Sequence, residues 1–150
     1  MIAWKYLDKQ TATVSVLNDF ENMTCIISLT PDGIKAVEDD MVSPRGSSVD
    51  DMPHARNLHS HEDKVLNSIN KIDVLKERYK QALEFMNWFK PAWDTLSEEE
   101  QIILSEFYLV TGSKTGVVGN LSEKLYIDRS NVYRRKEKAL EHLTVLLYGY

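Results

Sequence analysis

The chain has little cysteine and no long apolar run, and both absences restrict what it can be. Cys25 is the only cysteine among 150 residues, which excludes an internal disulfide and a cysteine-based zinc site and predicts a buried thiol in a cytoplasmic protein. No apolar stretch approaches the roughly 20 residues that span a bilayer. The first residues also lack a charged head before an apolar block, so no secretory signal and no membrane partner are predicted.

Positive charge is scarce overall, but it is unevenly distributed. The net charge is −5, and residues 1–110 hold 11 Lys and Arg against 19 Asp and Glu. Residues 111–150 hold 7 Lys and Arg against 4 Asp and Glu, which leaves this end at +3. Because phosphate responds to local charge, an acidic body with a basic C-terminal end favours a protein that touches DNA at one end.

The first 40 residues predict an N-terminal helical segment. Within residues 8–29, apolar positions such as Val14, Leu17 and Phe20 recur every three to four residues, although β-branched residues leave a short strand open. Residues 30–33, Thr-Pro-Asp-Gly, have the chemistry of a turn. Residues 41–60 are rich in Ser, Pro, Asp and Gly and predict a linker.

A long amphipathic helix is predicted over residues 61–89, within a connecting segment of residues 61–94. Its apolar side chains alternate in steps of three and four, with Lys76 at a missing position: Val65, Ile69, Ile72, Tyr79, Leu83 and Met86. We expect this seam to pack on the chain's own helices. A homodimer through the same seam is the alternative, but Lys76 would place a charge in the middle of that interface. Pro91 should end or kink the helix.

Residues 95–150 predict a small C-terminal helical domain. Thr95 or Ser97 can cap a helix whose first turn is acidic, and Ile102, Ile103, Phe107 and Leu109 supply its buried face. After a loop at residues 111–116, two helices are expected at 117–125 and 129–147, joined by a turn at 126–128. Asp128 or Ser130 can cap the second helix, and we expect Leu125 and Leu140 to be buried where the two helices meet.

The second of these helices carries the candidate site. Val132, Ala139, Leu140, Leu143 and Leu147 define its inner face, and the residues nominated to contact DNA are Arg129, Ser130, Asn131, Tyr133, Arg134, Arg135 and Lys138. Arg pairs with guanine edges, Asn with adenine, and a helix N-terminus with phosphate. Arg135 and Lys136 should turn partly toward the body. The competing interpretation is a solvated basic face with no ligand.

These residues carry a resemblance to a known family. Residues 96–104, LSEEEQIIL, resemble the opening helix of region four of bacterial sigma-70-type factors, and residues 120–135, NLSEKLYIDRSNVYRR, resemble its helix-turn-helix. Residues 138–143 are similar to its closing helix, although many such sequences have glycine where Tyr126 stands. The whole arrangement resembles phage-encoded late-transcription and autolysin regulators of Gram-positive bacteria. That resemblance implies an activator that binds DNA, near RNA polymerase.

Other chemistries are less well supported by the sequence. His54, His59 and His61 lack helical ligand spacing, so no metal site is predicted. Trp88, Phe89 and Trp93 could stack on bases, but their place on the apolar side favours core packing. Residues 112–116 lack the spacing of a phosphate-binding loop. No nucleophile and base can be paired, so neither an enzyme nor a cofactor is predicted.

The sequence therefore predicts an all-α protein in which a long central helix joins a C-terminal bundle resembling sigma region four. The expected function is a sequence-specific transcription regulator, a phage or prophage late-gene activator that binds double-stranded DNA. Two alternatives stay open: a module that binds RNA polymerase without contacting DNA, and the DNA-targeting part of a recombination or packaging assembly.

Overall fold

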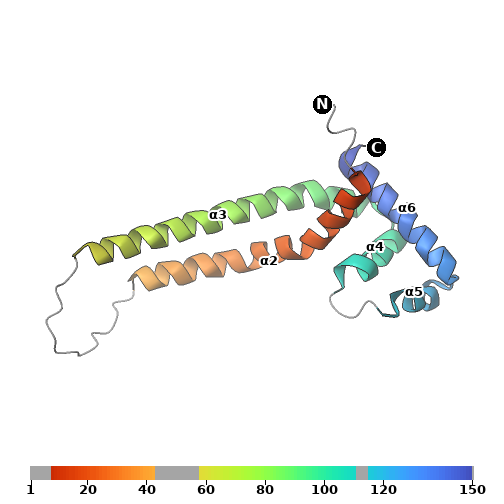
Figure 1. The fold of residues 1–150 in the computed structure, drawn as a ribbon, viewed down its shortest axis with the longest axis horizontal. Helices are drawn as coiled ribbons and strands as arrows, with labels where there is room; N and C mark the ends of the chain where they lie inside the picture. The colour runs from red at the N-terminus through yellow and green to blue at the C-terminus, as the bar shows by residue number, and fades with distance from the viewer. Residues whose placement is uncertain (1–7, 43–57, 111–114, 150) are drawn as a thin grey trace. The chain divides into compact units, whose positions relative to one another are not determined.

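The computed structural model describes residues 8–42, 58–110 and 115–149, and every element in these ranges is a helix (Figure 1). The elements are α2 (Lys9–Val42), α3 (Leu58–Thr95), α4 (Glu98–Leu104), the π-helix η1 (Ser105–Leu109), α5 (Val117–Leu125) and α6 (Arg129–Tyr148). The predicted all-α class is confirmed. None of the described helices is long and apolar enough to cross a membrane. Most of the predicted linker, residues 43–57, and residues 111–114 of the predicted loop lie outside the described residues.

The chain forms two compact units, and α2 and α3 contribute to both. The first unit combines Met1–Thr24 with Glu84–Tyr150, and the second is Cys25–Leu83. The first part of α2 therefore belongs to the same unit as the C-terminal helices.

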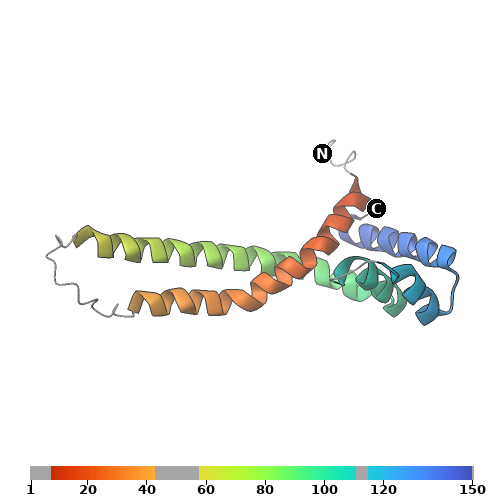
Figure 2. The same ribbon diagram turned by 60° about the horizontal axis from the view of Figure 1, so that its bottom comes forward.

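The second unit is an antiparallel hairpin in which α2 and α3 lie side by side (Figures 1 and 2). The side chains that α3 turns away from solvent there are Val65, Ser68, Ile72, Leu75, Tyr79 and Ala82. Every second position of the predicted seam is wrong by one residue. Ile69, Lys76 and Leu83 are exposed, and the residues just before them face inward instead. Ser68 and Ala82 are turned away from solvent although both are small and give a weaker apolar signal than Ile69 and Leu83. Lys76 therefore does not interrupt the seam.

The predicted turn at residues 30–33 is wrong, because α2 runs through it to Val42 with Pro31 inside the helix. An interior proline removes one backbone hydrogen bond and costs about 3 kcal/mol. Thr30 is buried, and Gly33 lies against α3, where a β-carbon at Gly33 would stand 3.8 Å from Leu75 Cδ1. Packing along the hairpin thus offsets the local preference of this segment for a turn.

The helix α3 likewise continues past Pro91 and ends at Thr95, so Pro91 does not end the helix, which was one of the two outcomes expected of it. Phe89 and Ala92 on either side of the proline are buried, and the Thr95 hydroxyl donates to the Pro91 carbonyl over 2.8 Å. Burial on both sides of Pro91 holds the last turn in place although proline supplies no amide there.

Cys25 lies exposed on α2, which corrects the expectation of a buried thiol. Its neighbours Ile26 and Ile27 are half-buried and occupy the inward positions of this turn. Three consecutive residues of a helix span most of its circumference, so they cannot all face one partner.

The core of the first unit joins the first part of α2 to α3, α4 and α6. Phe89 packs against Phe20 and Phe85 with ring centroids 5.2 and 5.6 Å apart, which confirms its predicted place in the core. Aromatic pairs at such distances add about 0.5–1.5 kcal/mol beyond their burial. The buried residues of this cluster are Leu17, Phe89, Ala92, Leu96, Leu104, Ala139, Leu140, Leu143 and Leu147.

A second, smaller cluster lies beneath α5 and the start of α6. Ile103, Leu121 and Val132 are its buried members, and Leu125 is partly buried against it. Leu140 belongs to the other cluster, so the expectation that Leu125 and Leu140 meet is wrong. Along α6, Ala139 of the main cluster lies seven positions after Val132, so about 10 Å of helix divides the two clusters.

Candidate nucleic-acid interface

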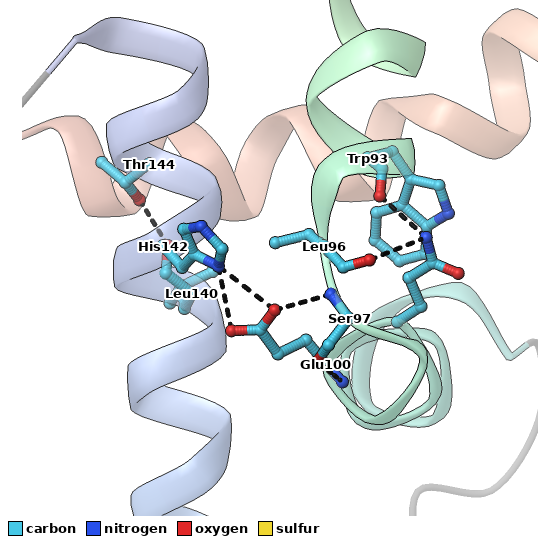
Figure 3. A network of polar contacts seen from close by, with 8 residues as sticks. Trp93, Leu96, Ser97, Glu100, Leu140, His142 and Thr144 are labelled. Atoms are coloured by element: carbon cyan, nitrogen blue, oxygen red, sulfur yellow. Dashed lines mark hydrogen bonds and ion pairs between the residues drawn. The ribbon is translucent and has the colours of Figure 1, made fainter.

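The helix α4 supports α6 from one side and is itself fixed at its start by a capping box. The Ser97 hydroxyl accepts from the Glu100 amide, and the Ser97 amide donates to the Glu100 carboxylate over 2.9 Å. The same carboxylate lies 3.0 Å from Nδ1 of His142 on α6 (Figure 3). Glu100 thus links the start of α4 to the middle of α6, and the predicted cap at Ser97 is confirmed.

These contacts determine the acidity of Glu100. Partial burial raises the pKa of the carboxyl, because it disfavours the charged form. The hydrogen bond from the Ser97 amide, the hydrogen bond and charge of His142 and the Ser97 hydroxyl all lower it, and together they outweigh burial. The pKa of Glu100 therefore lies below its ordinary value, and the carboxylate stays charged where it joins the two helices.

The predicted pair of C-terminal helices is confirmed with its turn. Tyr126 closes α5 in a left-handed conformation with φ of 55°, and the Ile127 amide donates to the Ser122 carbonyl over 3.2 Å. Asp128 stands at the N-cap of α6, but its side chain makes no capping hydrogen bond, contrary to expectation. The first-turn amides of α6 consequently have no side-chain partner within the described part of the chain.

The inner face of α6 is fixed by burial, and this sets which side chains point outward. Val132, Ala139 and Leu143 are fully buried, as predicted. Ser130, Arg134 and Lys138 are exposed and recur every four residues on the opposite side. These three nominated residues therefore form one outward strip along the first half of the helix.

Three other nominated residues lie on the flanks of that strip. Arg129 is exposed, and its guanidinium lies next to Gly119, where an added β-carbon would be 3.8 Å from Nη2. Tyr133 is 52% exposed, and its ring centroid lies 6.4 Å from that of Phe107. Asn131 is half-buried on the other flank. Packing thus orients Arg129 and Tyr133 before any ligand binds.

The prediction that residues 135 and 136 turn toward the body is confirmed. Arg135 forms an ion pair with Glu99 of α4, in which both side chains are partly exposed. The Lys136 side chain is 18% exposed, and its Nζ lies 5.1 Å from the Phe107 ring centroid and 3.3 Å from a Glu137 oxygen. Both cations already have intramolecular partners, so they are less available to bind a ligand than Arg134 or Lys138.

The π-helix η1 supplies a contact that sequence reasoning missed, because it places Phe107, which was expected only in a buried face, against Tyr133 and Lys136 of α6. Sequence reasoning also missed that Glu137 and Glu141 are exposed close to the outward strip. Their helical spacing from Arg134 could have revealed this, since residues three and seven positions apart share one side. The basic strip is therefore confined to the first half of α6.

Residues 128–138 contain five Lys and Arg against two Asp and Glu. An exposed helix start without a side-chain cap, which carries guanidinium groups and hydroxyls, can bind phosphates and hydrogen-bond to base edges. No group of described residues could hold a metal ion.

The chain matches no protein-family model, no curated protein and no solved structure.

Proposed function

We propose that this protein is a sequence-specific DNA-binding transcription regulator in which α5 and α6 act as a helix-turn-helix. In this proposal the first half of α6 enters the major groove. Arg134 lies at the centre of the contact, between Ser130 and Lys138. Arg129 and the first-turn amides reach the nearest phosphates.

One observation carries the proposal: the outward strip of Ser130, Arg134 and Lys138 lies directly opposite the buried Val132 and Ala139. The core thus holds the helix by one side and presents the other to a partner. A partner that approaches the N-terminal end of α6 meets guanidinium and ammonium groups before it meets Glu137 and Glu141, which suits a polyanion.

The resemblance of residues 96–143 to sigma region four supports a narrower proposal, an activator that works beside RNA polymerase. In that proposal the gene context is a phage or prophage late operon. The long hairpin of α2 and α3 lies outside the resembling residues 96–143, apart from the start of that range.

The test begins with selection of a binding site from random DNA duplexes by the full chain. Wild type and Arg134→Ala are then titrated against the selected duplex and an unrelated duplex at two salt concentrations. If Arg134 reads a base, its loss costs about 1–3 kcal/mol on the selected site and relaxes specificity there. If it binds phosphate, affinity falls alike for both duplexes and the salt slope decreases by about one.

Arg135→Ala is the matched control, because it removes the same side chain from the adjacent position, where Glu99 already holds the guanidinium. We expect its DNA affinity to stay close to wild type. If wild type enriches no sequence and its weak binding ignores salt, the proposal fails. A module that binds RNA polymerase without DNA then becomes the better explanation, and the carboxylates of Glu137 and Glu141 would belong to that protein contact.

A further inference from the structure

We infer that Tyr133 is a base-reading residue whose ring contacts the 5-methyl group of a thymine in the major groove. The inference rests on the proposed function and deepens it, because it names one feature of the DNA site that α6 binds. It starts from two facts about this side chain. The ring is 52% exposed near the start of α6, yet it is in contact with a second aromatic ring and with a lysine.

Two side chains hold the Tyr133 ring in place. Phe107 of η1 packs against the second cluster, and its ring centroid lies 6.4 Å from that of Tyr133. The Lys136 side chain is 18% exposed, and its Nζ lies 5.1 Å from the Phe107 centroid and 5.9 Å from the Tyr133 centroid. Aromatic rings attract each other at such distances, and a ring attracts a cation placed over it. The exposed part of Tyr133 therefore offers apolar surface in a fixed orientation, which lowers the side-chain entropy lost on binding.

The position of Tyr133 on α6 brings this surface beside the outward strip. Tyr133 lies three residues after Ser130, and residues three apart are neighbours on a helix surface. It also directly precedes Arg134, the centre of the proposed contact. When α6 lies in the major groove with Arg134 toward the bases, the Tyr133 ring is within reach of a neighbouring base pair or of its phosphate.

The charges around the ring favour the base over the phosphate. The Lys136 ammonium group beside the ring is paired with Glu137, whose Oε1 lies 3.3 Å from Nζ. Glu137 is exposed one turn after Tyr133, on the same flank of the helix. These two charges offset each other, and an exposed carboxylate at this place disfavours a phosphate. An uncharged apolar group suits the ring better, and the thymine methyl is the apolar group that base pairs present in the major groove.

The experiment compares thymine with uracil, which lacks only the 5-methyl group. Each thymine of the site selected from random duplexes is replaced in turn by uracil, and wild type is titrated against every duplex. At one position the loss of the methyl should weaken binding about fourfold, as expected when one apolar carbon loses its contact. Tyr133→Ala should bind both versions of that duplex equally. Tyr133→Phe should discriminate as wild type does, because it keeps the ring and loses only the hydroxyl.

Two further variants separate positioning of the ring from folding. Phe107→Leu keeps an apolar side chain in the second cluster but removes the ring that supports Tyr133. It should lower the ratio between the thymine and uracil duplexes and leave the affinity for an unrelated duplex unchanged. Tyr126→Ala is the matched control, because it removes a tyrosine that is 94% exposed and lies outside α6, and it should discriminate like wild type. Circular dichroism checks that every variant keeps its helices.

The inference is overturned, and the proposed function stands, if no thymine in the selected site is sensitive to the loss of its methyl. The same holds if the sensitivity survives unchanged in Tyr133→Ala. It also holds if Tyr133→Phe weakens binding to every duplex alike, which is the behaviour of a hydroxyl that binds a phosphate. A wild type that selects no sequence from the random duplexes overturns the proposed function and the inference together.

Discussion

The hydroxyl oxygens of Thr13 and Thr144 lie 2.8 Å apart inside the first unit, although 131 residues separate them in sequence. Thr13 Oγ1 is also 2.8 Å from the Lys9 carbonyl oxygen, and Thr144 Oγ1 is 2.7 Å from that of Leu140. Each hydroxyl has one hydrogen, so the hydroxyl that donates to the other cannot also donate to its own helix, and the hydroxyl that accepts is the one that donates to the carbonyl of its own helix. The pair fastens the start of α2 to α6.

Replacing either threonine by valine should lower the free energy of unfolding by about 1 kcal/mol, because it removes one buried hydrogen bond without creating a cavity. The double variant should lose less than the sum of the two, since no hydroxyl then remains without its partner. Urea unfolding of the four proteins measures this coupling. Thr24→Val is the control: its hydroxyl makes only the local bond to the Phe20 carbonyl and is exposed, so we expect a change within about 0.5 kcal/mol. Strictly additive losses would show that the hydroxyls do not interact.

Tyr126→Gly should stabilise the protein by about 0.5–1 kcal/mol. Tyr126 is the one non-glycine residue with positive φ in the described part of the chain, and it is 94% exposed. Glycine relieves the left-handed strain and loses no packing, although its freer unfolded state offsets part of the gain. Tyr126→Ala retains the strain and should bring no such gain. Thermal melts that rank alanine with glycine would assign the effect to loss of the exposed ring.

Leu140→Ala should cost about 2–5 kcal/mol, because Leu140 is 4% exposed within the main cluster of the first unit. Leu125→Ala should cost clearly less, since Leu125 is only partly buried at the smaller cluster. Chemical denaturation of the two variants compares them directly. Equal losses would mean that the α5–α6 junction is packed as tightly as the main core.

The Glu100 contacts should make stability depend on pH on the acid side. Because the pKa of Glu100 is lower in the folded chain than its ordinary value of 4.5, its contribution is fully present above that value. The contribution disappears as the pH falls through the lower, folded-state pKa. Wild type should therefore be more stable than Glu100→Gln at neutral pH, and the difference should narrow as the pH falls below 4.5.

Denaturation series at several pH values follow this difference. Glu98→Gln is the control, because it removes a carboxylate from the same first turn without touching the Ser97–Glu100 cap or His142. The Glu98→Gln variant should keep most of the dependence of stability on acid pH that wild type shows. An equal difference between wild type and Glu100→Gln at all pH values would contradict the role given to the carboxylate.

The local features of the C-terminal region could be predicted because their signals are short-range. The Ser97–Glu100 cap needs residues three apart, and the boundaries of α5 and α6 follow from a turn between two apolar repeats. The outward strip of Ser130, Arg134 and Lys138 follows once Val132 and Ala139 are known to point inward. The partners of Arg135 and Lys136 could not be predicted, because Glu99 and Phe107 lie far from these two cations in sequence.

The sequence by itself determined the helical class, the acidic body with its basic end, and the inner face of α6, since composition and periodicity act within one helix. Tertiary structure alone decided that helices continue through Pro31 and Pro91. Packing against another segment there outweighs a local penalty of about 3 kcal/mol. It also decided the seam of α3, where Ser68 and Ala82 face inward and Ile69 and Leu83 do not. Close approach of two helices favours small side chains, and no apolar pattern records where a partner helix will come close.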